Sequence, residues 1–152
     1  MIICSAIILS TSCDKAKPAG FWNTYHNDNI SNKESDQGPW GGHTNIIWKS
    51  ETVNSFDSKE IIDFAIKNNW TFIDSNSIST DTLETYTASE SMNNEYCEDI
   101  LRKDVLPKWN GQKVKVLKFK TGWVAIEPGD AKQTEINGFA TINLLGTELH
   151  IY

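Results

Sequence analysis

The three histidines are the side chains best suited to bind a metal or transfer a proton, but their spacing supports neither role. His26 lies near Asp28, and His43 follows the glycine-rich stretch at residues 38–42. Neither His26 nor His43 has a second histidine at the H-x-x-x-H spacing that marks many divalent-metal sites. His150 alternates with apolar neighbours, so we expect it to face solvent from one side of a strand. We therefore expect no metal site and no cofactor.

Motifs for covalent or phosphate chemistry are also missing from the sequence. The glycine-rich stretch 38–42 lacks the Lys-Ser/Thr pair of a phosphate-binding loop, and no Gly-x-Ser-x-Gly nucleophile elbow occurs. Cys97 lies in a helical pattern, where a buried thiol commonly acts as a small hydrophobic group. A carboxylate pair for glycoside hydrolysis stays open, because the spacing of such a pair is set in space. These observations favour a protein that is not an enzyme.

Six tryptophans are many for a chain of 152 residues. Three lie in or beside apolar runs and are expected in the core: Trp48, Trp70 and Trp109. The others lie next to loops or turns, where an indole is often partly exposed. With a nearby histidine they form a candidate ligand or partner surface: Trp22, Trp40, His43 and Trp123. Such indoles can stack on sugars or act as interface hot spots, and the alternative is that they cover the core.

The first 13 residues combine a short apolar run with small residues and a cysteine. The run is too short to cross a bilayer as a helix, and Ser10-Thr11-Ser12 leads directly to Cys13. This segment resembles a bacterial lipoprotein signal. The resemblance implies that residues 1–12 are a signal peptide, that Cys13 carries the lipid, and that the protein is anchored in the bacterial cell envelope. A buried strand ending in an ordinary cysteine is the alternative.

The remaining sequence predicts a tether at residues 13–20 and a single domain at residues 21–152. The formal net charge is −6, and no cluster of Lys and Arg occurs. Affinity for nucleic acid comes largely from neutralised phosphates, so a nucleic-acid partner is not expected. A basic protein partner or a neutral ligand fits this charge better, and the oligomeric state stays open.

Periodicity predicts an α+β fold, with an antiparallel sheet of about five strands and two helices packed on one face. Asp57 is the expected cap of a first helix, with Glu60 as its capping-box partner and Asn68-Asn69 at its end. A second helix is expected over residues 91–106. The expected strands cover residues 44–49, 70–74, 113–120, 123–126, 139–145 and 148–152, and the last two form a hairpin about Gly146.

Asp81-Thr82-Leu83 resembles a sequon for periplasmic O-glycosylation, which implies a sugar on Thr82. Combined with the expected address, the sequence favours a lipid-anchored, non-enzymatic domain that binds another macromolecule, such as an immunity or inhibitor protein. Two alternatives stay open. One is a domain that binds or hydrolyses envelope glycans, and the other is a structural envelope lipoprotein.

Overall fold

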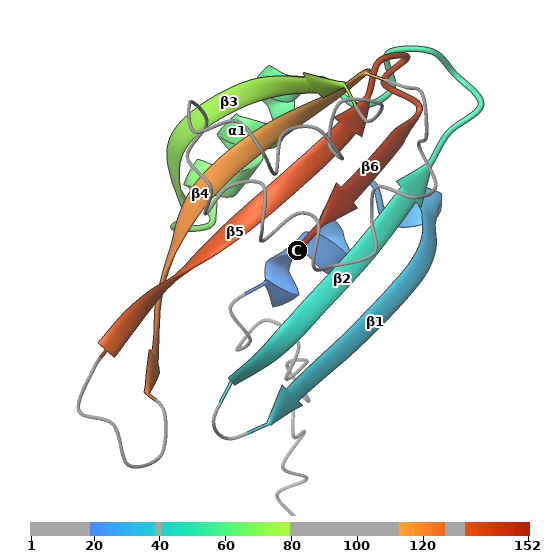
Figure 1. Ribbon diagram of the computed structural model, residues 1–152. Helices are drawn as coiled ribbons and strands as arrows, with labels where there is room; N and C mark the ends of the chain where they lie inside the picture. The colour runs from blue at the N-terminus through green and yellow to red at the C-terminus, as the bar shows by residue number, and fades with distance from the viewer. Residues whose placement is uncertain (1–18, 39–40, 80–112, 127–132) are drawn as a thin grey trace, which may run out of the picture.

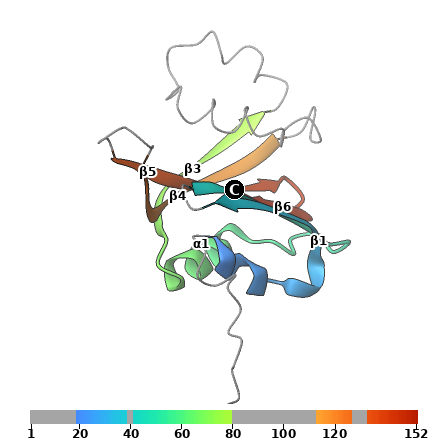
Figure 2. The same ribbon diagram turned by 90° about the horizontal axis from the view of Figure 1, so that it is seen from below.

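The computed structural model describes residues 19–38, 41–79, 113–126 and 133–152. These residues form a mixed α+β fold, in which a six-stranded antiparallel sheet has one α-helix and two short 3₁₀ segments on one face (Figures 1 and 2). The elements are η2 (Gly20–Thr24), η3 (Asn27–Asn29), β1 (Ile30–Gly38), β2 (Gly41–Lys49), α1 (Ser58–Lys67), β3 (Thr71–Ser79), β4 (Lys113–Ile126), β5 (Gln133–Asn143) and β6 (Glu148–Ile151).

The sheet has the strand order β1-β2-β6-β5-β4-β3, so β1 and β3 are its edges. It has six strands where the sequence predicts about five. Strand β1 was not expected, because it lies in a stretch that looks like polar loop. The residues that follow Ile30 in β1, numbers 31–35, are all exposed. Without a buried face, an edge strand does not produce the alternation by which a strand is recognised.

Helix α1 begins and ends as the sequence predicts. Asp57 caps it, because its Oδ1 accepts hydrogen bonds from the backbone N–H groups of Lys59 at 2.8 Å and Glu60 at 3.2 Å. Asn69 adopts a φ of 69°, in the left-handed region expected after a helix C-terminus. The expected return bond from Glu60 to the cap is replaced by a contact between its Oε1 and His26 Nε2 at 2.9 Å. The second expected helix, residues 91–106, lies outside the described residues.

An aromatic cluster fills the space between α1 and the sheet. Trp48 and Trp70 are buried there as predicted, with 0% and 3% of their surface exposed. The indole N–H of Trp48 donates a 2.7 Å hydrogen bond to the carbonyl of Tyr25, which ties the N-terminal 3₁₀ segments to β2. Phe119 of β4 contacts Trp70 at a ring-centroid distance of 5.6 Å. Trp109, the third tryptophan expected in the core, lies outside the described residues.

Strand β4 is one strand where the sequence predicts two. The turn expected at Thr121-Gly122 is a bulge, at which the pairing of β4 with β5 shifts register between Lys120 and Val124. Gly122 has a φ of 75°, a conformation that glycine adopts at little cost. The predicted hairpin between β5 and β6 is confirmed, with a φ of 61° at Gly146.

His150 is buried, which corrects the expectation that it faces solvent. Its side chain is 1% exposed, and its Nε2 lies 2.7 Å from Glu148 Oε1. Strand β6 is interior to the sheet, where His150 pairs with Ile47 of β2 and Thr141 of β5, and both of these residues are also buried. Alternation in the sequence separates the two faces of a strand, but it does not say whether the second face is covered.

Candidate functional site

Trp22 belongs to the core, which removes it from the candidate surface. It is fully buried, and its ring lies edge-on to Tyr25, Trp48 and Trp70 at centroid distances of 5.8, 6.3 and 5.6 Å. The cause is local: η2 places its indole directly against α1 and the sheet. The sequence around Trp22 resembles a loop, but the segment is η2, which packs on the core.

The other predicted residues fall into three different situations. Trp123 lies in β4 and is 48% exposed. His43 lies in β2, where its backbone is opposite Asp36 of β1. Trp40, Cys13 and Thr82 lie outside the described residues. Of the residues predicted to form the candidate surface, Trp123 is exposed and Trp22 is buried.

Trp123 is held on an extension of the sheet that we term the distal arm, consisting of residues 121–126 of β4 and 133–136 of β5. The arm projects at the lower left of Figure 1, beyond the part of the sheet that α1 covers. Thr121 fixes its base, because the buried hydroxyl donates to the carbonyl of Ile136 at 2.7 Å and accepts the N–H of Trp123 at 3.2 Å. Bulges of this kind re-aim side chains, and here the indole and Val124 are both exposed.

An ion pair flanks the exposed side chains of the distal arm. Lys120 Nζ lies 2.9 Å from Glu135 Oε2, and about half of each side chain is exposed. Exposed pairs of this kind add little stability, so the pair contributes a polar rim more than a fold constraint. Exposed tryptophan side chains are enriched at protein-binding surfaces, and charged groups are typical of the rims of such surfaces.

A second exposed apolar group, which the sequence analysis did not identify, lies at the turn between β5 and β6. We term it the tip, and it consists of Val53, Leu144 and Leu145, which are 55%, 73% and 57% exposed. The backbone N–H of Asn54 donates to the carbonyl of Leu145 at 2.8 Å, which joins the residue 50–56 loop to the turn. Both leucines were expected in the strand over residues 139–145, whereas β5 ends at Asn143 and the leucines lie in the turn.

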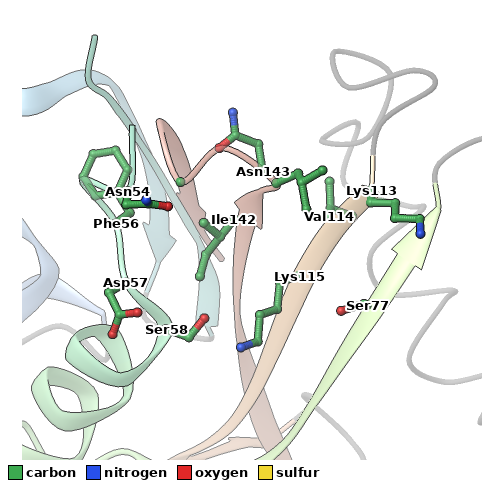
Figure 3. Close-up of a pocket in the computed structure, with 12 residues that line it drawn as sticks. Asn54, Phe56, Asp57, Ser58, Ser77, Lys113, Val114, Lys115, Ile142 and Asn143 are labelled. Carbon is green, nitrogen blue, oxygen red and sulfur yellow. The ribbon is translucent and has the colours of Figure 1, made fainter. Parts of the chain in front are cut away.

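A cleft of about 240 Å³ lies beside the tip, between the start of α1 and the start of β4 (Figure 3). Its walls carry Asp57 and Ser58 on one side and Lys113 and Lys115 on the other. Its apolar surface includes buried Ile142 of β5. The cleft thus combines cationic and apolar groups in a small volume.

Two further properties bear on function. Within the described ranges, no group of three or more His, Cys, Asp and Glu side chains is arranged to hold a metal ion. No helix in that same part of the chain is long and apolar enough to cross a bilayer.

Comparison of the chain with protein-family models, curated proteins and solved structures gives no match.

Proposed function

We propose that this protein is a lipid-anchored, non-enzymatic protein of the bacterial cell envelope whose domain binds another protein through the distal arm. The observation that supports binding is the exposure of Trp123 and Val124, at 48% and 43%, on a backbone fixed by Thr121. Tryptophan is enriched among residues that dominate binding energy, and a fixed backbone lowers the entropy lost on association. An immunity or inhibitor protein is the form of this function that we favour.

The proposed localisation in the cell envelope rests on the sequence of residues 1–13. Its test is the intact mass of the protein from its native host, where we expect a mature chain that begins at Cys13 and carries acyl groups. A mature chain that retains an unmodified Met1 would remove the lipid anchor from the proposal. Binding by the distal arm would still stand, because it depends on different residues.

The exposed indole also supports the second candidate, an envelope glycan-binding domain. Aromatic rings stack on sugars, and the Lys120–Glu135 pair at 2.9 Å supplies polar groups on the same two strands. Val124 favours the protein partner, since an exposed aliphatic side chain suits an apolar contact and offers no hydrogen bond to a sugar hydroxyl. A structural envelope lipoprotein, the third candidate, predicts no specific ligand at all.

The test compares Trp123→Ala with Ile66→Ala, a change of another exposed apolar residue that lies on α1 and is 52% exposed. Each tagged chain is recovered from the producing strain and its competitors, and partners are identified by mass spectrometry. We expect one protein to accompany the wild type and Ile66→Ala, and its affinity for Trp123→Ala to fall about tenfold or more. Retention of Trp123→Ala by that partner would refute the role of the arm. Retention of the wild type on peptidoglycan, lost in Trp123→Ala, would favour the glycan reading.

A further inference from the structure

The cleft beside the tip has a charge opposite to that of the chain as a whole. The chain has a formal net charge of −6, but among the described residues the cleft is lined by two lysines, Lys113 and Lys115, and one acidic residue, Asp57. Both lysine side chains are exposed to solvent. Figure 3 shows the ammonium group of Lys115 directed toward the wall that carries Ser58.

The carboxylate of Asp57, the one acidic side chain in the described lining of the cleft, is already engaged by the helix. Asp57 Oδ1 accepts hydrogen bonds from two backbone N–H groups of the first turn of α1, at 2.8 and 3.2 Å. Its charge is therefore balanced in part by the positive end of the helix dipole. The ammonium group of Lys115 dominates what remains, because Figure 3 shows the ammonium group of Lys113 directed away from Ser58. The described lining therefore favours an anion at Lys115.

The apolar lining restricts the kind of anion. Phe56 and Ile142 are each 3% exposed, and Leu144 is 73% exposed at the rim. An inorganic ion would leave the exposed side chain of Leu144 in contact with water, whereas an aliphatic chain would cover it. The volume of about 240 Å³ is below the range of about 300–1,000 Å³ that is usual for drug-sized ligands, so the chain must be short.

The walls of the cleft are fixed before any ligand arrives. Asn143 closes the turn, because its side-chain oxygen accepts the N–H groups of Thr147 at 2.8 Å and Glu148 at 3.1 Å. The N–H of Phe56 donates to the carbonyl of Gly146 at 2.9 Å, which holds the loop before α1 against the same turn. A preformed site of this kind loses little conformational entropy on binding.

We propose that this cleft binds a carboxylate carried on a short aliphatic stem, with the carboxylate at Lys115 and the stem along Ile142 and Leu144. Such a group occurs in free short-chain carboxylates and at the C-terminus of a peptide that ends in an aliphatic residue. The proposal does not depend on the distal arm, which lies at the other end of β4 and β5 (Figure 1).

The test uses amide chemical shifts of the ¹⁵N-labelled full-length chain. Sodium hexanoate is expected to shift the amide signals of Ser58, Lys115 and Leu144, with a dissociation constant on the order of 1 mM, typical of a small ligand. Hexan-1-ol and hexylamine carry the same stem without the carboxylate, and each is expected to bind at least about tenfold more weakly. Equal binding of hexan-1-ol would refute the role of Lys115.

Lys115→Met and Lys67→Met form a matched pair of variants, since Lys67 is an exposed lysine at the far end of α1. We expect Lys115→Met to weaken hexanoate binding about tenfold or more and Lys67→Met to leave it unchanged. The amide spectrum itself reports whether each variant is folded. Unchanged affinity in a folded Lys115→Met, or no shift in the wild type, would overturn the proposal.

Two peptides that end in Leu-Leu, one with a free C-terminal carboxylate and one with an amide, distinguish the two sources of the ligand. Binding of the acid peptide, but not of the amide, identifies a chain terminus as the source. Binding of hexanoate alone identifies a free carboxylate. Trp123→Ala is expected to bind these probes as the wild type does, so a failure here is separate from a failure of the proposed function.

Discussion

The distal arm and the part of the sheet that α1 covers share strands β4 and β5, yet the side chains of the two regions meet opposite environments. In β4, Leu117 and Phe119 are fully buried, whereas Trp123 and Val124 are 48% and 43% exposed. The bulge that begins after Lys120 separates the two parts. Up to that point η2 and α1 supply apolar groups over the strand, and beyond it the described structure places no helix (Figure 2).

This difference shows that the burial of an apolar residue depends on what packs over its strand. Trp22 and Trp123 make the same point for tryptophan, since both lie in turn-like sequence and their exposed fractions are 0% and 48%. The indole that meets three other aromatic rings stabilises the fold. The indole of the arm is 48% exposed, and it is the one that we propose binds a partner.

The largest expected difference between the two regions is in stability. Replacing Trp22 by Ala removes a ring that contacts Tyr25, Trp48 and Trp70, and leaves a cavity. We expect the free energy of unfolding to fall by about 3–5 kcal/mol, measured by guanidinium denaturation. Trp123→Ala is expected to change it by less than about 0.5 kcal/mol. A loss of similar size in both variants would mean that the arm is part of the core.

Two glycines provide a second contrast of smaller size. A Cβ on Gly138 would lie 2.5 Å from two ring atoms of Trp70, inside the covered region. A Cβ on Gly122, at the base of the arm, would meet nothing within 4 Å, but its φ of 75° strains any other residue. We expect Gly138→Ala to cost about 1–3 kcal/mol, through displacement of Trp70.

Gly122→Ala is expected to cost about 1–2 kcal/mol, through backbone strain alone. Near-ultraviolet circular dichroism separates the two effects. It should change for Gly138→Ala, where tryptophan packing is disturbed, and stay as in the wild type for Gly122→Ala. A changed aromatic signal in Gly122→Ala would show that the bulge also positions the core.

A final effect, confined to alkaline solution, is a pH dependence expected from buried tyrosines outside the arm. Burial raises the pKa of Tyr25 well above its ordinary value, assisted by the charges of Glu60 and Asp57, and burial alone raises that of Tyr152. The unfolded chain releases these protons above a pH of about 10, whereas the folded protein retains them. Stability is therefore complete below that pH and falls above it, by up to about 1.4 kcal/mol per pH unit for each tyrosine.

Denaturation curves on either side of this pH measure the effect. Tyr25→Phe should flatten the alkaline decline by the share of that tyrosine, and Tyr152→Phe should do the same for the other. The arm contains no tyrosine, so Trp123→Ala should leave the slope as it is in the wild type. An alkaline decline that persists in the double Phe variant would assign it to other groups.

Local signals predicted those elements whose own residues determine them. Asp57 and Asn69 mark the ends of α1 because a cap and a left-handed residue are local features. Gly146 marks the hairpin for the same reason. Strand β1 was missed, since pairing with β2 depends on another segment and residues 31–35 bury no face.

The candidate surface was predictable only in part, because exposure is decided by distant segments. Trp123 is exposed, as expected for a tryptophan beside a turn, although the expected turn is a bulge. The same signal placed Trp22 at the surface, and the docking of η2 buries it instead. The cleft was not predictable. Its walls come from α1, β4 and the β5–β6 turn, and no spacing in the sequence brings Ser58 and Lys115 together.

The place of β6 in the sheet has a consequence for how the protein folds. Residues 148–151 pair with residues 46–49 of β2 on one side and with β5 on the other, so they join β1–β2 to β5–β4–β3. A continuous sheet cannot form until this short strand is in place between two strands that are distant in sequence. Closing so long a loop is entropically costly and slows folding toward the millisecond-to-second range typical of non-local β topologies. During synthesis, β1–β2 and β5–β4–β3 are therefore joined into one sheet only after β6 has been made.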